Sequence, residues 1–298
     1  MTRRPLVAWL ANRTSPEAEA LQVPEGVEVV DEPRADVTFA VPAWNAAGDL
    51  RAMPELEVVQ VRSAGVDWIV DDVPPGVTLC SARGTRDAGM AEWVVLALLA
   101  DVRRVGELAR AQGERRWADG VPQRDLAGLR VLILGHGSIG RAVAERLAPF
   151  GCEVAGVARR ARDGMHGMDE LDALLPAADA VVNLLPLTSE TQGLVDAATL
   201  ARMRDGALYV SAGRGATTDT GALLAELQRE RLRAVLDVVD PEPLPAGHPL
   251  WSAPGVLISP HLAGDSPAGE RAAWALVGEQ LRRHAAGEPL ANVVVDGY

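Results

Sequence analysis

Three widely spaced segments of the chain each carry one side chain suited to acid–base or carboxylate chemistry. They are "SAGRGATTD" with Arg214, "LDVVDPEPLP" with Glu242, and "SPHLAG" with His261. A guanidinium group holds a carboxylate through paired N–H donors and polarises a neighbouring carbonyl. An imidazole can protonate a developing alkoxide, and a carboxylate on its other ring nitrogen fixes the tautomer and raises the imidazole pKa. Together these side chains are suited to the reduction of a 2-keto acid.

Each of the three residues also has a purely structural interpretation. His261 follows a proline and is compatible with a hydrogen-bonded structural histidine, while Arg214 is compatible with a surface ion pair. Glu242 is compatible with a solvated position in a proline-rich turn. The chemical interpretation is favoured because all three segments are expected at the carboxyl ends of strands in one sheet, where ligands bind in open α/β folds.

A glycine-rich turn precedes these segments. In "VLILGHGSIGRAVAERL", an apolar strand is followed by a GxGxxG spacing that opens a helical pattern. Glycines at these positions let the backbone approach a pyrophosphate, which lies at the helix N-terminus. The sequence therefore predicts a dinucleotide site made of Gly135, Gly137, Ser138, Ile139 and Gly140. The alternative is a glycine turn that only packs the strand against the helix.

The next predicted strand, 153–158, ends in arginines where an NAD site usually presents an acid. It closes on Ala158, 158 − 140 = 18 positions after Gly140, and alanine accepts no hydrogen bond from the ribose hydroxyls. Arg159 and Arg160 follow at once, and their guanidinium groups suit a 2′-phosphate. The sequence therefore predicts NADP, with NAD as the second choice. A solvated basic loop on an acidic protein is the alternative.

The elements that must position these groups form two alternating series of strand-like and helix-like segments. The first series has compact apolar runs at 6–10, 27–30, 37–41, 56–61 and 77–80. The second has such runs at 130–135, 153–158, 180–185, 207–212, 234–239 and 256–260. Alternation of this kind predicts parallel sheets covered by helices. We expect an α/β protein with two Rossmann-like or flavodoxin-like domains.

Helical patterns suggest where the two domains meet. A long pattern runs from about Asp87 to Trp117, and an amphipathic pattern near the C-terminus is expected to return the chain to the first domain. The first domain is therefore predicted to be discontinuous, with residues 1–98 completed by 268–298. Residues 99–267 are predicted to form the dinucleotide-binding domain. A shorter helix is expected after Ser15, with Pro16 at its first position.

Composition excludes several classes of function. The formal charge of −12 and the pI near 4.9 argue against nucleic-acid and anionic-membrane partners. No lysine is present, which excludes a Schiff-base lysine and a P-loop lysine. Cys80 and Cys152 lie outside any CxxC pair, so no disulfide framework and no metal site are expected. Apolar runs too short for a signal peptide or a membrane span favour a cytoplasmic protein.

The chain resembles the D-isomer-specific 2-hydroxyacid dehydrogenase family, which includes glyoxylate/hydroxypyruvate reductases. The resemblance is strongest from Leu129 to Ser266 and rests on "GHGSIGRAVAERLAPFG", "LLPLTSETQGLV", "GRG", "LDVVDPEPLPAGHPLW" and "SPHLAG" in family order. It implies that Arg214, Glu242 and His261 are the substrate-binding and catalytic residues. It also implies cofactor contacts from Leu185, Pro186, Ala212, Asp237, His261 and Gly264. The segment "RSAGVD" looks like the loop whose N–H groups bind the substrate carboxylate, at Ala64, Gly65 and Val66.

The resemblance implies an NADPH-dependent 2-keto acid reductase acting on a substrate such as glyoxylate or hydroxypyruvate, and a homodimer built through the cofactor domain. Two alternatives keep the fold. One is a non-catalytic, cofactor-sensing binding protein like the co-repressor relatives of the family, and the other is a formate- or phosphite-type dehydrogenase. Three positions depart from the family pattern. Ser211 stands where an asparagine is frequent, and Asp87 stands where many relatives have a cofactor-contacting threonine. The acid is missing at Ala158, as it is in NADP-using relatives.

Overall fold

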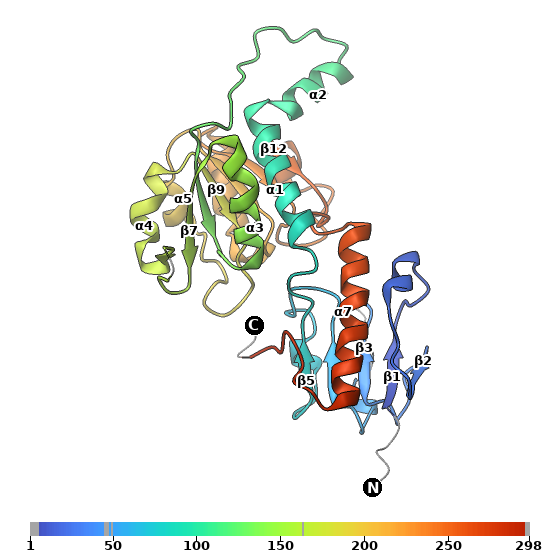
Figure 1. Cartoon of the computed structure of the whole chain (residues 1–298). Helices are drawn as coiled ribbons and strands as arrows, with labels where there is room; N and C mark the ends of the chain where they lie inside the picture. The colour runs from blue at the N-terminus through green and yellow to red at the C-terminus, as the bar shows by residue number, and fades with distance from the viewer. Residues whose placement is uncertain (1–5, 45–47, 49, 163, 296–298) are drawn as a thin grey trace. The chain divides into compact units, whose positions relative to one another are not determined.

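The chain folds into two compact α/β units (Figure 1). The structure is a computed structural model, and it describes residues 6–44, 48, 50–162 and 164–295. The first unit combines Met1–Asp87 with Asp265–Tyr298, and the second is Ala88–Gly264. The first unit is thus discontinuous, and the chain passes between the units at 87/88 and 264/265, where the sequence predicted 98/99 and 267/268.

The first unit is built on a five-stranded parallel sheet with the order β2-β1-β3-β4-β5. Its strands are β1 (Leu6–Leu10), β2 (Val27–Val30), β3 (Phe39–Val41), β4 (Val58–Gln60) and β5 (Thr78–Cys80). The long helix α7 (Pro267–Ala286) lies along one face of this sheet (Figure 1). It contributes the fully buried Trp274, Val277 and Leu281 to a core shared with Leu10 and Phe39. Burial of these side chains holds the C-terminal segment on the first unit.

The second unit contains a seven-stranded parallel sheet with the order β12-β11-β10-β9-β6-β7-β8. Its strands are β6 (Arg130–Leu134), β7 (Glu153–Ala158), β8 (His166–Gly167), β9 (Ala180–Asn183), β10 (Leu208–Ser211), β11 (Arg233–Leu236) and β12 (Val256–Ile258). The strand order reverses between β6 and β9, so the loops that follow these two strands diverge to opposite faces. Such a switch point is where doubly wound sheets bind ligands.

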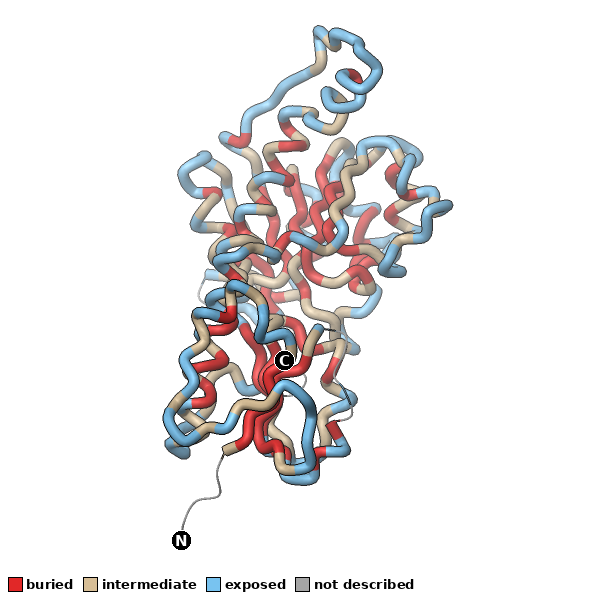
Figure 2. The backbone as a smooth tube through the Cα atoms, turned by 90° about the vertical axis from the view of Figure 1, so that its right-hand side faces the viewer, coloured by how far each residue is buried: buried red, intermediate tan, exposed pale blue. Residues whose placement is uncertain are grey.

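Helices cover both faces of the second sheet, whose strands are the most buried part of this unit (Figure 2). The helices are α1 (Asp87–Val102), α2 (Val105–Gly113), α3 (Ser138–Leu147), α4 (Leu171–Leu174), α5 (Ala197–Arg202) and α6 (Thr220–Gln228). One core joins α1 and α3 to side chains such as Ile133 and Val182, and the other joins α5 and α6 to side chains such as Leu134 and Tyr209. The two cores fix the sheet edge that carries the candidate site.

The predicted long helix over 87–117 is wrong, because the structure contains two helices there. The helix α1 ends at Val102, and Arg104 takes a left-handed conformation with φ +53° before α2 begins at Val105. Gly106 then approaches β12 so closely that a Cβ on it would lie 2.6 Å from Leu257 Cδ2. Tertiary packing of α2 on the sheet thus breaks the pattern. Among the described helices, none combines the length and the apolar character needed to cross a bilayer.

Some shorter elements differ from the sequence prediction, and others were not part of it. The segment after Ser15 is a 3₁₀ helix, η1 (Pro16–Ala20), and the Ser15 side chain makes no capping hydrogen bond. The helix α6 is capped by Asp219, whose carboxylate accepts a hydrogen bond from the Ala222 N–H. The strand β8 is only two residues long and was not predicted. The remaining 3₁₀ helices are η2 (Leu50–Ala52), η3 (Val70–Asp72), η4 (Ala148–Phe150), η5 (Met168–Glu170), η6 (Leu175–Ala177), η7 (Gly215–Thr217) and η8 (Pro249–Ser252).

Candidate active site

The glycine turn after β6 lies against the segment that follows β9. Gly135 has φ +91°, and a Cβ on it would lie 2.9 Å from the Leu184 carbonyl carbon and oxygen. Gly140 lies in the first turn of α3, where a Cβ would lie 2.9 Å from the Gly135 carbonyl oxygen. Only glycine fits these two positions. A side chain on Gly135 would push the turn away from the segment after β9, and a side chain on Gly140 would push α3 away from the turn.

The middle glycine of this turn has open space above it. Gly137 is the N-cap residue of α3, and a Cβ on it would meet no atom within 4 Å. Ser138 and Ile139 begin the helix directly after it. The N-terminal N–H groups of a helix favour an anion, and an open glycine lets that anion approach the backbone. This turn therefore fits the diphosphate of a dinucleotide.

The end of β7 presents arginines beside the glycine turn. The strand closes on Ala158, as the sequence predicted, and the Gly135 and His136 N–H groups both donate to the Val157 carbonyl. The Arg159 guanidinium forms an ion pair with the Glu190 carboxylate, and both side chains are mostly exposed. Arg160 is exposed as well. The only acid that the structure brings to Arg159 among the described residues is thus Glu190, from the loop after β9.

The carboxyl ends of β9 and β10 form a buried surface next to the glycine turn. Leu185 and Ala212 are 4% and 5% exposed, and the Ala212 N–H donates to the Asn183 carbonyl at 3.0 Å. The Pro186 carbonyl accepts a hydrogen bond from the Thr191 hydroxyl at 2.6 Å. These residues follow strands on the same side of the switch point, so they lie at the edge where the cofactor is expected.

The two glycines that flank Arg214 both make close backbone contacts. A Cβ on Gly213 would lie 2.4 Å from the Leu185 carbonyl oxygen, and a Cβ on Gly215 would lie 1.8 Å from the Val239 carbonyl oxygen. Arg214 is therefore held between the segment after β9 and the segment after β11. Its backbone is extended, and its guanidinium donates to the Gly213 carbonyl at 2.9 Å.

His261 and Glu242 form a hydrogen-bonded pair. His261 Nδ1 lies 2.9 Å from Glu242 Oε2, and Glu242 Oε1 accepts a hydrogen bond from the Val239 N–H at 2.9 Å. The bond to Glu242 raises the pKa of His261, against the opposing effects of burial and of the Arg214 charge. Burial raises the pKa of Glu242, but the His261 and Val239 hydrogen bonds outweigh it, so the pKa is lowered. The pair favours a charged imidazole and a charged carboxylate.

The turn that carries His261 is organised by Asp237, which is 3% exposed. One carboxylate oxygen of Asp237 accepts hydrogen bonds from the Ser259 hydroxyl at 2.6 Å and the Leu262 N–H at 2.8 Å. The other accepts the Ala263 N–H at 2.9 Å. The His261 N–H donates to the Asp237 carbonyl at 2.8 Å while His261 itself has φ +56°. Asp237 thus stabilises the left-handed conformation that orients the imidazole.

Arg214, Glu242 and His261 follow three neighbouring parallel strands, β10, β11 and β12. Because parallel strands end at the same edge, the three side chains meet there, and the charge of Arg214 acts on the pKa of both His261 and Glu242. Both carboxylate oxygens of Asp237 accept hydrogen bonds from the turn that carries His261. The expected contact of Asp237 with a nicotinamide carboxamide therefore stays a prediction.

In the first unit, the loop after β4 presents donors that no described residue accepts. The N–H groups of Ala64, Gly65 and Val66 make no hydrogen bond to another described part of the chain. Two hydrogen bonds hold the loop in place: the Ser63 hydroxyl donates to the Gly65 carbonyl at 2.7 Å, and the Ala82 N–H donates to the Ser63 carbonyl at 2.8 Å. Adjacent free N–H groups on a fixed loop suit a carboxylate.

Two tryptophans lie beside this loop. The Trp68 indole N–H donates to the Ser63 hydroxyl at 3.1 Å, and the Trp44 ring lies 5.1 Å from the Trp68 ring between centroids. Trp44 is 46% exposed, so part of its ring faces solvent. The loop therefore combines polar donors with an exposed aromatic surface.

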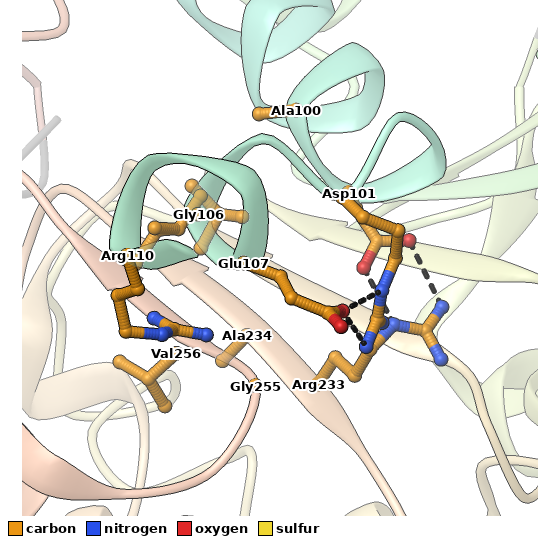
Figure 3. A pocket seen from close by; sticks show the side chains of 12 residues that line it. Ala100, Asp101, Gly106, Glu107, Arg110, Arg233, Ala234, Gly255 and Val256 are labelled. Atoms are coloured by element: carbon orange, nitrogen blue, oxygen red, sulfur yellow. Dashed lines mark hydrogen bonds and ion pairs between the residues drawn. The ribbon is translucent and has the colours of Figure 1, made fainter. Parts of the chain in front are cut away.

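A hollow in the second unit lies away from this edge, near the amino ends of β11 and β12 (Figure 3). Arg233 makes two hydrogen bonds to the Asp101 carboxylate at its rim, and Arg104 forms an ion pair with Glu107. The first pair connects α1 to β11, and the second lies at the start of α2. In each pair, the positive charge of the arginine is compensated by a carboxylate. The hollow contains none of the predicted site residues.

The chain matches the family model described as D-isomer specific 2-hydroxyacid dehydrogenase, NAD binding domain, over residues 95–263. Among curated proteins, it is 30% identical over 270 residues to glyoxylate/hydroxypyruvate reductase A from Citrobacter koseri, covering 86% of this chain and 85% of that protein. The residues matched by the family model include every candidate residue of the second unit except Gly264.

Solved structures resemble both units of the chain. A D-isomer specific 2-hydroxyacid dehydrogenase from Xanthobacter autotrophicus Py2, in complex with NADPH and MES, is 34% identical with a TM-score of 0.86, covering 99% of this chain and 100% of that one. An NADPH-dependent glyoxylate/hydroxypyruvate reductase from Sinorhizobium meliloti, in complex with NADP and sulfate, is 31% identical with a TM-score of 0.84 and the same coverage.

Proposed function

The chain belongs to the family of D-isomer specific 2-hydroxyacid dehydrogenases, which are NAD(P)-dependent oxidoreductases, and on this basis we propose that it reduces small 2-keto acids with NADPH. The observation that carries the proposal is the His261–Glu242 hydrogen bond of 2.9 Å on the sheet edge that also carries Arg214 and the glycine turn. A binding protein without catalysis needs no paired imidazole and carboxylate there.

The bound cofactor supplies the hydride that reaches the carbonyl carbon. His261 donates a proton from Nε2, the ring nitrogen opposite the one that Glu242 bonds, to the carbonyl oxygen as that oxygen becomes an alkoxide. Glu242 bonds the opposite nitrogen, which keeps the imidazole oriented and stabilises its protonated form. Arg214 binds the substrate carboxylate and polarises the carbonyl. Glyoxylate and hydroxypyruvate are the proposed substrates.

The proposed site for the cofactor uses the glycine turn for the diphosphate and the surface of Leu185, Pro186 and Ala212 for the nicotinamide side. The absence of an acid at Ala158 and the presence of Arg159 and Arg160 support NADPH over NADH. In the proposed complex, the Arg159 guanidinium exchanges Glu190 for the 2′-phosphate.

The N–H groups of Ala64, Gly65 and Val66, which donate to no described residue, are proposed to bind the substrate carboxylate. Three donors on a fixed loop offset part of the desolvation of that carboxylate. The tryptophans next to the loop, Trp44 and Trp68, favour a short or apolar substituent on the keto acid.

We further propose a homodimer built through the second unit, in the cytoplasm. The helices α1 and α2 expose large apolar side chains, namely Leu96 (60%), Val105 (48%) and Leu108 (38%), and the following loop exposes Trp117 (92%). An apolar surface of this kind supports association with a second copy. Cys80 and Cys152 are free thiols, which suits a reducing compartment.

The proposed function is tested by a panel of 2-keto acids assayed with NADPH and NADH side by side. Oxidation of NADPH with glyoxylate or hydroxypyruvate, at a higher kcat/KM than with NADH, is the expected result. Formate and phosphite with NADP⁺ serve as alternative donors in the same assay. If formate or phosphite is oxidised and no keto acid is reduced, the proposal is wrong and the protein is a formate- or phosphite-type dehydrogenase.

A further inference from the structure

A buried polar network lies directly beneath Arg214 in the second unit. Its members are Asn183 at the end of β9, Tyr209 on β10, and Thr217 in η7, and all three are fully buried. Burying polar groups is unfavourable unless each one is hydrogen-bonded. The hydrogen bonds of this network can therefore be followed from residue to residue. They end at Leu185 and at Arg214, which both belong to the proposed binding site.

The orientation of the Asn183 amide is fixed by the backbone. Its Oδ1 accepts a hydrogen bond from the Leu185 N–H at 3.1 Å, so its Nδ2 must donate on the other side. The Nδ2 lies 2.8 Å from the Tyr209 hydroxyl and 2.8 Å from the Thr217 hydroxyl. The two amide hydrogens are directed at these two oxygens, since the next acceptor, the Thr218 hydroxyl, lies farther away at 3.4 Å.

The Thr217 hydroxyl has one proton, and this geometry decides where it goes. Because Asn183 donates to that hydroxyl, the hydroxyl donates onward to the Arg214 carbonyl at 2.6 Å. The Thr217 N–H donates to the same carbonyl at 3.1 Å. The Arg214 carbonyl thus receives two hydrogen bonds from one residue, and the hydroxyl bond is aligned by Asn183.

The Tyr209 hydroxyl forms a separate branch. It accepts from Asn183 and lies 2.6 Å from the Thr218 hydroxyl, and no bond from this branch reaches Arg214. The branch is as buried as the other, so its removal carries a similar cost in stability. The chain thus contains an internal control for the Thr217 branch.

We propose that Asn183 and Thr217 are positioning residues for Arg214. They fix the peptide that follows Arg214, so that its guanidinium is presented to the substrate carboxylate in one orientation. Through Leu185, the same amide fixes the segment proposed to contact the cofactor. This inference rests on the proposed function, because it assigns Arg214 its role toward the substrate.

The test compares Thr217→Val with Tyr209→Phe and Thr217→Ser. Thr217→Val keeps the shape of the side chain and removes the hydroxyl, so we expect kcat/KM for the keto acid to fall about tenfold or more. The dissociation constant of NADPH is expected to stay within about twofold, because the Asn183–Leu185 bond remains. Tyr209→Phe is expected to lower Tm by a similar amount but leave kcat/KM within about twofold. Thr217→Ser retains the hydroxyl and is expected to restore most of the activity.

Amide hydrogen exchange supplies a readout independent of turnover. In the unliganded protein, Thr217→Val is expected to speed exchange at residues 214–218 more than Tyr209→Phe does. Equal losses of kcat/KM in the two variants, or no recovery in Thr217→Ser, would overturn the inference. Failure of the proposed function looks different, because the native protein would then show no keto-acid turnover while the exchange difference persists.

Discussion

At the scale of single residues, His261 is the group on which the proposed chemistry depends. The left-handed conformation of its backbone is stabilised by Asp237, and its ring is oriented by Glu242. Hydrogen bonding to a carboxylate raises the pKa of an imidazole, which keeps it protonated at higher pH. A protonated imidazole is the form that can act as an acid in the reduction of a ketone.

This electrostatic arrangement predicts the pH dependence of the reduction. The active form has His261 protonated, and its pKa lies above the ordinary value of 6.5. Activity for reduction is therefore expected to fall as the pH rises through that pKa, while oxidation of the hydroxy acid rises over the same range. Glu242→Gln removes the largest cause of the shift, so the falling limb of kcat/KM is expected to move to lower pH. A limb that stays in place in this variant would contradict the assigned role of Glu242.

The arginines after β7 give a prediction about cofactor choice. Charge-assisted hydrogen bonds contribute about 1.5–3 kcal/mol each, so Arg159→Ala is expected to raise the dissociation constant of NADPH about tenfold or more and that of NADH little. Glu190→Gln removes the acid that competes for Arg159, so it is expected to tighten NADPH binding a few-fold. Fluorescence titration with both cofactors measures these changes. Equal effects on the binding of NADPH and NADH would contradict the role of Arg159 and favour the alternative, a solvated basic loop.

The sequence alone indicated the proposed catalytic residues, and it indicated only some of the residues that contact them. Arg214, Glu242 and His261 stand in recognisable segments after apolar strands. Asn183 and Thr217 have no such signal, because their importance comes from a hydrogen bond between residues 34 positions apart in the chain. An asparagine at the end of a buried strand is the only sequence feature that could have drawn attention to it.

At the scale of elements, short apolar runs predicted the strands well. The strands β1, β2 and β7 have the predicted bounds, because β-branched runs flanked by polar residues define a buried parallel strand. The helices were predicted less well, since the break at Arg104 depends on the packing of Gly106 against Leu257 rather than on a local stop signal. Two-residue β8 is too short to show any periodicity.

The close approach of η7 to the segment after β11 gives a prediction at this scale. Gly215→Ala would place a methyl group 1.8 Å from the Val239 carbonyl oxygen, so the two segments must separate. Overpacking of this kind costs about 1–3 kcal/mol or more, and we expect a lower Tm together with a loss of keto-acid turnover. Gly247→Ala is the matched control, because a Cβ there meets no atom within 4 Å. The Tm of each variant is measured by thermal unfolding. Equal Tm values for Gly215→Ala and Gly247→Ala would contradict the close contact at Gly215.

At the scale of the whole molecule, an acidic protein must bind an anionic cofactor and an anionic substrate. The formal charge of −12 repels both ligands at long range, so binding depends on local groups. The groups we propose for this role are the helix N-terminus at the glycine turn, the arginines after β7, and Arg214. Binding of the two anions is thus expected at a few positively charged positions of a chain whose net charge is negative.

Association of two copies is predicted to depend on α1 and α2. We expect light scattering to give twice the chain mass of 31.5 kDa for the native protein. Leu96→Glu introduces a charge on the most exposed apolar residue of α1, which is expected to shift the protein to a monomer. Val23→Glu, at an exposed apolar position of the first unit, is the control and is expected to leave the mass unchanged. A native monomer would contradict the proposed dimer.

The most direct test of the account is the rate of hydride transfer in His261→Asn, measured in a single turnover with saturating NADPH and glyoxylate or hydroxypyruvate. Asparagine cannot supply the proton, so the rate is expected to fall about 10²–10⁴-fold while the dissociation constant of NADPH changes little. A rate close to that of the native protein would show that the proton comes from elsewhere and would contradict the role of the His261–Glu242 pair.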